Sequence, residues 1–345
     1  MAVTLKDIAA RVGKSLTTVS RALADYDDVS PTTRAEVRRV AQELGYEPNT
    51  IARQLQKRRT DTLALIFPTS DPRFSDPFFS EFLAGVGNEA ARQGFALLTS
   101  TQAEGEEENR AYLKNIRSRR VDGFVIIRTR RHDARIALLR EYNYPFVAFG
   151  RIANDNNFAF VDVDSEVGMK LAVDHLAGLG HTRLAFIAAP PDFMFAHYRL
   201  KGFTDALHAH GLPLDPTLVI EGDLTQRAGR AIGKQLLQMT APPTAIVACN
   251  DLMALGAMAA AQELGLVVGR DVSITGFDDV TPAEHAHPPL TTVHQPIYQI
   301  GTMICQMLVK IIKGEGLAKQ KIVLPPSLMV RQSSGLKKNQ SNERG

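Results

Sequence analysis

The sequence contains no tryptophan, only two cysteines and no long hydrophobic run. Without tryptophan, any ring stacking against a ligand must use Phe or Tyr. Cys249 and Cys305 lie far apart within apolar stretches, which favours two reduced, buried thiols over a disulfide. No segment approaches the run of about eighteen apolar residues that indicates a membrane span, and the N-terminus lacks the apolar core of a signal peptide. We therefore expect a cytoplasmic protein without a membrane partner.

Motifs of the common enzyme classes are also missing. The chain has no glycine-rich phosphate loop, no Gly-x-Ser-x-Gly and no clustered spacing of metal ligands. His285 and His287 form a His-x-His pair, but two prolines follow, which favours a loop over a metal site. We predict that the protein is not an enzyme and that it uses no cofactor and no metal.

Net charge is low but unevenly distributed. The chain of 345 residues has 40 Lys/Arg and 37 Asp/Glu, a formal charge of +3. Residues 1–60 contain eleven Lys/Arg against seven Asp/Glu, a net of +4, so the remainder is nearly neutral. A small basic segment ahead of a near-neutral body indicates a local site for a polyanion.

The N-terminal 45 residues have the signals of three short helices. Thr4 and Ser15 can cap the first two, and Gly13 between them suits a turn with positive φ. Ser30 followed by Pro31 provides a cap and a first helical residue for the third. The predicted helices span residues 5–12, 16–23 and 31–44.

Two short helices joined by a glycine-containing turn are what a helix-turn-helix requires. The second helix can then enter the major groove of DNA. On it, Arg21 can reach a guanine edge, and Leu16 or Thr17 can touch a thymine methyl. Thr18, Ser20 and the helix N-terminus can bind phosphate. The alternative is a plain three-helix domain that binds another protein.

The pattern changes after residue 61. Short apolar segments alternate with helical ones, which favours parallel, doubly wound sheets. About ten strands with a break near residues 161–165 suggest two similar lobes. The polar tail is predicted to be disordered. Expected strands are residues 63–67, 96–99, 124–127, 146–149, 160–163, 184–188, 218–221, 245–249, 273–277 and 290–294.

Three ordered segments resemble the headpiece of the lactose-repressor (LacI/GalR) family. They are Thr4–Arg21, Val29–Arg34 (VSPTTR) and Leu44–Asn49 (LGYEPN). The resemblance continues to about residue 333, nearly the whole chain. One departure lies near Ala24, where the family often carries Asn and this chain does not.

The resemblance implies that residues 47–61 are a hinge that folds into a short helix on operator DNA. In the family, two such helices pair in the minor groove and insert apolar side chains between base pairs, which kinks the duplex. The matching residues are Ala52 and Leu55; an ordinary flexible linker is the alternative. The DNA-binding candidates are Thr4, Ser15, Leu16, Thr17, Thr18, Ser20, Arg21, Asn49, Ala52 and Leu55.

The body resembles the family's effector-binding core, whose fold is that of periplasmic sugar-binding proteins. The implied fold is an all-α helix-turn-helix headpiece followed by an α/β core of two doubly wound parallel-sheet lobes joined by crossover strands. The expected divisions are a headpiece at 1–46, the hinge at 47–61, a first lobe at 62–161 and 294–322, a second lobe at 162–293 and 323–333, and a disordered tail at 334–345.

Effector-binding candidates are polar or aromatic side chains near the carboxyl ends of the predicted strands, where such folds bind ligands. Arg199 lies in a motif similar to the family's R-x-x-G. Asn250 follows one strand, and Asp251 next to it is equally suited to capping a helix. Phe78 and Phe79 are either a ligand cover or core. The candidates are Asp76, Phe79, Arg128, Arg151, Arg199, Asn250, Asp278 and Gln295.

The family resemblance implies a transcription regulator, most simply a repressor, that binds double-stranded operator DNA as a homodimer and responds to a small molecule. Two-fold symmetry of a dimer predicts a roughly palindromic operator. The polar set Arg199, Asn250 and Asp278 favours a sugar or glycoside as the effector. A purine- or nucleoside-responsive regulator of the same family and a transport-type sugar-binding protein are the alternatives.

Overall fold

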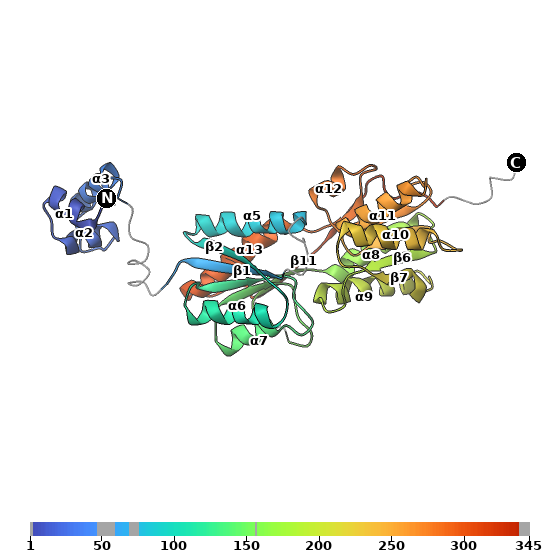
Figure 1. Ribbon diagram of the computed structural model, residues 1–345, viewed down its shortest axis with the longest axis horizontal. Helices are drawn as coiled ribbons and strands as arrows, with labels where there is room; N and C mark the ends of the chain where they lie inside the picture. Colours follow the sequence, from blue (N-terminus) through green and yellow to red (C-terminus); the bar gives the residue numbers. More distant parts are fainter. Residues whose placement is uncertain (1–2, 47–58, 69–75, 156, 338–345) are drawn as a thin grey trace. The chain divides into compact units, whose positions relative to one another are not determined.

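The computed structural model describes residues 3–46, 59–68, 76–155 and 157–337. The chain divides into two compact units, Met1–Thr60 and Asp61–Gly345, which are considered separately (Figure 1). The predicted hinge residues Asn49, Ala52 and Leu55 lie outside the described residues.

The first unit consists of three helices, α1 (Leu5–Val12), α2 (Leu16–Leu23) and α3 (Pro31–Glu43). Each starts at an expected cap. The Thr4 N–H donates to Asp7 Oδ2 at 2.8 Å, and Ser15 Oγ accepts from the Thr18 N–H at 3.1 Å. Such caps are each worth about 1 kcal/mol. The helices enclose a small core that includes Ile8, Val19, Val37 and Val40.

The second unit contains two six-stranded sheets, which define the first and second lobes. The first sheet is parallel throughout, in the order β11-β5-β4-β3-β1-β2. Its strands are β1 (Thr62–Pro68), β2 (Ala96–Gln102), β3 (Gly123–Ile126), β4 (Phe146–Phe149), β5 (Phe160–Val163) and β11 (Lys321–Leu324).

The second sheet has the order β12-β10-β9-β8-β6-β7, and only its edge strand β12 runs antiparallel. Its strands are β6 (Leu184–Ala188), β7 (Val219–Glu221), β8 (Ala245–Ala248), β9 (Ser273–Asp278), β10 (Thr291–His294) and β12 (Ser327–Met329). The expected strand from residue 218 starts one residue later, because Pro216–Leu218 form a short 3-10 turn.

Helices cover both faces of each sheet. Figure 1 shows α5 (Pro77–Arg92) and α13 (Ile297–Lys313) on one face of the first sheet and α6 (Glu106–Arg117) and α7 (Ala134–Glu141) on the other. On the second sheet, α8 (Ser165–Gly178) packs with α9 (Met194–Ala209), and α10 (Gln226–Leu237) packs with α11 (Asp251–Glu263). The short helix α12 (Thr281–Glu284) follows β9.

The contact between α5 and α13 depends on glycine. A Cβ added at Gly85 would lie 2.2 Å from the Tyr298 carbonyl oxygen, and one at Gly301 would lie 2.6 Å from the Phe82 carbonyl oxygen. Neither position has room for a larger residue, so the two helices approach each other through facing glycines.

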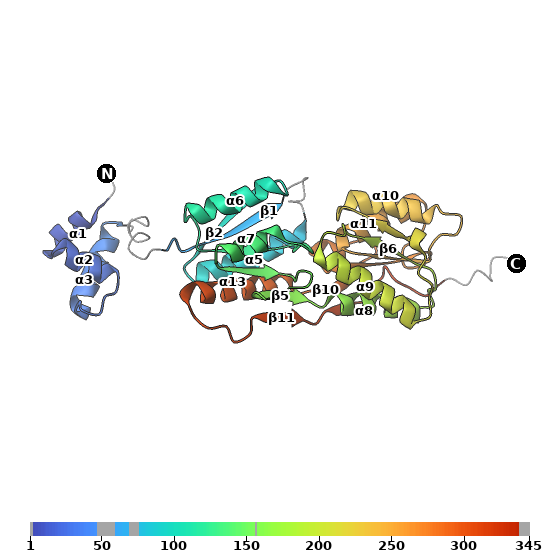
Figure 2. The ribbon, with the colours of Figure 1, turned by 90° about the horizontal axis from the view of Figure 1, so that it is seen from below.

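The chain crosses between the lobes after Val163, His294 and Leu324, since β5 and β11 belong to the first sheet and β10 to the second. These crossings lie one or two residues after the expected divisions at 161, 293 and 322. Figure 2 shows α13 and β11 along one edge of the first lobe. Residues from both lobes line one pocket at the carboxyl ends of these strands.

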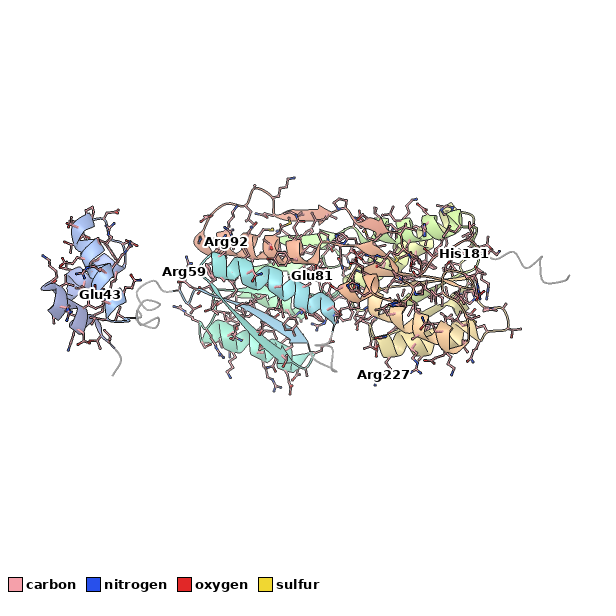
Figure 3. The ribbon with its side chains drawn as sticks, turned by 90° about the horizontal axis from the view of Figure 1, so that it is seen from above. Glu43, Arg59, Glu81, Arg92, His181 and Arg227 are labelled. Carbon is pink, nitrogen blue, oxygen red and sulfur yellow. The ribbon has the colours of Figure 1, made fainter. Side chains whose placement is uncertain are left out.

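The segment from Ser333 to Lys337 is ordered on the second lobe. Ser333 Oγ donates to the Ile274 carbonyl at 2.6 Å, and the Lys337 N–H donates to the Leu179 carbonyl at 3.0 Å. His181, labelled in Figure 3, lies 3.0 Å through Nε2 from the Gly335 carbonyl. The expectation of a tail disordered from residue 334 is therefore wrong for residues 334–337; residues 338–345 lie outside the described part.

Candidate functional site

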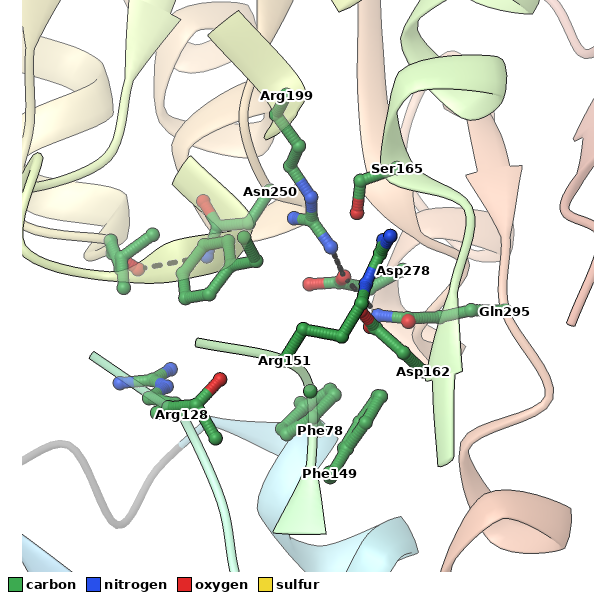
Figure 4. Close-up of a pocket in the computed structure, with 14 residues that line it drawn as sticks. Phe78, Arg128, Phe149, Arg151, Asp162, Ser165, Arg199, Asn250, Asp278 and Gln295 are labelled. Carbon is green, nitrogen blue, oxygen red and sulfur yellow. Dashed lines mark hydrogen bonds and ion pairs between the residues drawn. The ribbon is translucent and has the colours of Figure 1, made fainter. Parts of the chain in front are cut away.

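A pocket lies between the two lobes, at the carboxyl ends of strands from both sheets (Figure 4). Six of the eight predicted effector-binding residues line it. Its lining comprises Phe78, Arg128, Thr129, Phe149, Gly150, Arg151, Asp162, Ser165, Phe195, Arg199, Leu224, Asn250, Asp278 and Gln295.

Arg199 and Asp278 form the buried polar centre of the pocket. Arg199 Nη2 donates to Asp278 Oδ1 at 3.3 Å, and Gln295 Nε2 donates to the same oxygen at 2.6 Å. The Arg199 guanidinium also donates to the Cys249 carbonyl and lies 3.6 Å from the centre of the Phe277 ring. Burial raises the pKa of Asp278 to about 6, although the charge of Arg199 opposes the shift.

The backbone is strained at Asp278 and at the residue that follows it. Asp278 has φ 119° and Asp279 has φ 59°, both in the region that favours glycine. Asp279 is held by Arg331 at 2.7 Å and by His294 Nδ1 at 2.9 Å. Strained residues concentrate where a side chain must be aimed into a site, and here the strained turn directs Asp278 into the pocket.

A second ion pair lines the same pocket. Arg151 follows β4, and its Nε donates to Asp162 Oδ2 at 2.6 Å. Its guanidinium lies 4.0 Å from the centre of the Tyr198 ring on α9, so Arg151 links the first lobe to the second. Burial raises the pKa of Asp162, and Arg151 counteracts part of that shift.

Asp76 and Phe79 are not among the residues that line this pocket. Asp76 caps α5, because its Oδ1 accepts from the Phe78 N–H at 3.1 Å, and its Oδ2 accepts from Arg128 Nη2 at 3.0 Å. The Phe79 ring packs edge-on against Phe67 and under the Arg128 guanidinium. Phe79 was expected to cover a ligand, but it does not line the pocket; its neighbour Phe78 does.

Asn250 is the cap of α11, a role that the sequence had suggested for Asp251 instead. Asn250 Oδ1 accepts from the Met253 N–H, and its Nδ2 donates to the Leu224 carbonyl, both at 3.0 Å. Asp251 instead accepts from the Val280 N–H at 2.9 Å and is buried, which raises its pKa. Asn250 therefore lines the pocket with both ends of its amide already bonded.

The sequence-based reasoning missed several lining residues, above all Asp162, Ser165 and the ring of Phe149. Asp162 sits within the apolar strand Phe160–Val163, and a lone carboxylate in a buried strand is a signal that could have found it. Phe149 stacks on Phe78, with ring centres 5.9 Å apart, and nothing local in the sequence pairs these two rings.

Backbone hydrogen bonds join the two lobes next to Thr129, which lines the pocket. The Met194 N–H in the second lobe donates to the Thr129 carbonyl in the first at 2.9 Å, and the Arg131 N–H donates to the Asp192 carbonyl at 2.8 Å. The loop from the first lobe rests on a buried ion-pair cluster, in which Arg135 Nη2 bonds Asp133 Oδ2 at 2.7 Å. The lobes are therefore held by hydrogen bonds as well as by crossover strands.

In the headpiece, exposed side chains of α2 share one concave face. It is lined by Leu5, Leu16, Thr17, Ser20, Arg21 and Tyr26. Thr4, Ser15 and Thr18 instead bond locally at helix starts, with 2.8 Å between Ser15 Oγ and Thr18 Oγ1. The backbone N–H groups of Thr4 and Thr18 are themselves bonded within these caps, to Asp7 Oδ2 and Ser15 Oγ.

Within the described part of the chain, no group of three His, Cys, Asp or Glu side chains is arranged to hold a metal ion. No helix among those residues is long and apolar enough to span a membrane. Cys249 and Cys305 are buried free thiols.

Comparison with known proteins bears on both units. A model described as bacterial regulatory proteins, lacI family, matches residues 4–49, and one described as a periplasmic binding protein-like domain matches residues 173–334. The HTH-type transcriptional regulator CelR of Thermobifida fusca is 38% identical over 335 residues, covering 96% of this chain and 98% of CelR.

Solved structures of related proteins also match nearly the whole chain. A complex of the transcriptional regulator CelR with cellobiose matches with a TM-score of 0.75 at 37% identity, covering 96% of this chain and 100% of that one. The Lac repressor dimer bound to operator and the anti-inducer ONPF matches with a TM-score of 0.85 at 30% identity, covering 97% and 99%. These relatives are transcription regulators, and this chain, with its helix-turn-helix headpiece and two-lobed core, belongs to the lacI family of bacterial regulatory proteins.

Proposed function

We propose that the protein is a repressor whose binding to operator DNA is controlled by a sugar or glycoside in the pocket between its lobes. The observation that carries the proposal is the pairing of two buried carboxylates, Asp162 and Asp278, with two arginines, Arg151 and Arg199. Charged groups of this kind form strong hydrogen bonds with the hydroxyls of a sugar.

The apolar side of the pocket fits the same ligand. Phe78 and Phe149 are stacked, and Phe195 lies against the Arg199 guanidinium at 4.9 Å. Flat rings pack well against the C–H face of a pyranose. The relative CelR has been solved as a complex with cellobiose, which favours a glycoside.

A nucleoside is the second candidate. Phe78 and Phe149 both line the pocket and supply aromatic surface for a base. In that case the carboxylate–arginine set would bind the ribose hydroxyls.

The position of the pocket between the lobes explains how a ligand can control DNA binding. A ligand held by both lobes stabilises one relative pose of the lobes, and it changes DNA binding only through different affinities for the two poses. Residues 47–61 precede β1 of the first lobe, so in a homodimer the pose sets the spacing of the two connectors. We propose that Leu16, Thr17 and Arg21 contact bases, and that Ala52 and Leu55 insert into the minor groove.

The test begins with purified full-length protein and a library of random palindromes, from which it should select one operator. Melting temperature is then measured with cellobiose, other glycosides and nucleosides. The expected result is a rise with one chemical class, and the same compound should change operator affinity in fluorescence anisotropy. Selection of an operator combined with a rise only for nucleosides would transfer the proposal to the second candidate.

A further inference from the structure

The arginine on the exposed face of α2 is already paired within the headpiece. Arg21 Nε donates to Asp28 Oδ1 at 3.1 Å, and Arg21 Nη2 lies 2.7 Å from Asp28 Oδ2. The two groups therefore meet side-on through two parallel contacts. The guanidinium also lies 4.9 Å from the centre of the Tyr26 ring. Together these contacts restrict a side chain that would otherwise sample many rotamers in solvent.

Asp28 lies in a loop that is held by hydrogen bonds from Arg34. Arg34 Nη2 donates to the Tyr26 carbonyl at 2.8 Å and to the Val29 carbonyl at 3.2 Å, on either side of Asp28. Val29 is buried in the headpiece core, and Asp25 is paired with Arg38. The loop between α2 and α3 is thus tied at both ends, so the Asp28 carboxylate has a fixed position.

The side-on pairing leaves a defined edge of the guanidinium unused by Asp28. Arginine has five N–H donors in a rigid plane. Asp28 uses the Nε donor and one Nη2 donor, which leaves the second Nη2 donor and both Nη1 donors. That end-on edge is the one whose spacing matches the O6 and N7 acceptors of guanine in the major groove.

We propose that Asp28 is a positioning residue that orients Arg21 to read a guanine in each operator half-site. The proposal rests on the proposed function, in which α2 enters the major groove. It assigns the acidic residue a role in specificity at some cost in affinity. The carboxylate repels phosphates, so it weakens binding to every sequence, while it keeps Arg21 in the conformation that fits one base pair.

The chain provides a matched control. Asp27 is exposed in the same loop, whereas Arg21 is paired with its neighbour Asp28. Asp27→Asn removes the same charge from almost the same place without touching the pairing. If Asp28 acted only through its charge, Asp27→Asn and Asp28→Asn would change base discrimination equally. If Asp28 positions Arg21, only Asp28→Asn should reduce discrimination.

The experiment measures relative affinities of full-length wild type, Arg21→Ala, Asp27→Asn and Asp28→Asn for the selected operator and for each single base-pair change in its half-site. Asp27→Asn should keep the discrimination of wild type. Asp28→Asn should lose about fivefold to tenfold at the one base pair where Arg21→Ala also loses it, since a good bidentate contact discriminates by about tenfold or more. Discrimination at the other positions should stay within twofold.

Two results would overturn the proposal: equal discrimination by Asp28→Asn and Asp27→Asn, or a loss at a base pair that Arg21→Ala does not affect. Thermal unfolding checks that the headpiece is intact. If Asp28→Asn unfolds, Asp28→Glu retains the charge with a longer reach and should still weaken discrimination at that base pair; unaltered discrimination would equally refute the role. Failure of wild type to select any operator would refute the proposed function instead, so the two failures are distinguishable.

Discussion

Asp278→Asn should make the protein more stable at neutral pH while it weakens effector binding. Asparagine has nearly the same shape and can still accept the 2.6 Å hydrogen bond from Gln295 Nε2. What disappears is a buried negative charge. Because binding sites are often built at the expense of stability, this substitution separates the two effects.

The magnitude follows from the pKa. Burial raises the pKa of Asp278 from 3.8 to about 6. Each pKa unit corresponds to about 1.4 kcal/mol, so ionised Asp278 destabilises the fold by about 3 kcal/mol at pH 7.5 relative to a neutral side chain. Between pH 3.8 and about 6 the folded state keeps a proton that the unfolded state has lost, so stability falls as pH rises through this window.

The assay is urea unfolding followed by far-ultraviolet circular dichroism at pH 5, 6 and 7.5. Asp278→Asn should gain about 1–3 kcal/mol at pH 7.5, with less gain at pH 5, where the wild-type side chain already carries a proton. Calorimetry with the compound identified in the melting screen should show affinity reduced by about tenfold to a hundredfold, which is the usual range for a hydrogen bond to a charged group.

Asp279→Asn is the matched control. Asp279 is the next residue, but it pairs with Arg331 at 2.7 Å outside the pocket lining. Its substitution should reduce stability without changing the affinity for the effector. A less stable Asp278→Asn protein at pH 7.5 would refute the argument from the buried charge, and unchanged effector affinity would remove Asp278 from the site.

Three further predictions concern packing, the pocket and the hinge. Gly85→Ala should cost about 1–3 kcal/mol of unfolding free energy by urea titration, because overpacking against backbone is hard to relieve, whereas Gly87→Ala, with its nearest neighbour at 3.9 Å, should be neutral or stabilising. Phe78→Ala should weaken the effector about tenfold in calorimetry through lost ring contact, while operator affinity without effector stays unchanged. Leu55→Ala should weaken operator binding in anisotropy and leave effector binding intact; equal operator affinity would contradict insertion into the minor groove.

The parts of the fold that depend on local chemistry were predictable. Gly13 has φ 68° between α1 and α2, and Ser30 caps α3 with Pro31 at its first position. Most strands of the core lie close to their expected places because each is an apolar run between helical segments. β11 was not expected, since Lys321–Leu324 alternates exposed and half-buried residues at the edge of the first sheet and has no continuous apolar run.

Errors at the candidate site came from contacts between distant residues. Phe78 and Phe79 are adjacent on α5, so they point in directions about 100° apart, and only the position of the sheet decides which of them faces the pocket. The sequence suggested Asp251 as a cap and Asn250 as a ligand contact, but Asn250 caps α11, because the start of the helix depends on where β8 ends. The ordered segment 334–337 is polar in sequence, but it is held by bonds to residues such as Leu179, which lie far away in the chain.

The VSPTTR motif shows how a family resemblance can be explained physically. Ser30 Oγ accepts from the Thr33 N–H at 3.2 Å and starts α3. Arg34, one turn later, reaches back to two carbonyls of the preceding loop and thereby sets the position of Asp28. Through Asp28, the motif also affects the arginine on α2. Arg34→Ala should therefore reproduce the loss of base discrimination expected for Asp28→Asn, because it removes both hydrogen bonds that Arg34 Nη2 donates to the Tyr26 and Val29 carbonyls; retained discrimination would show that Asp28 does not depend on this brace.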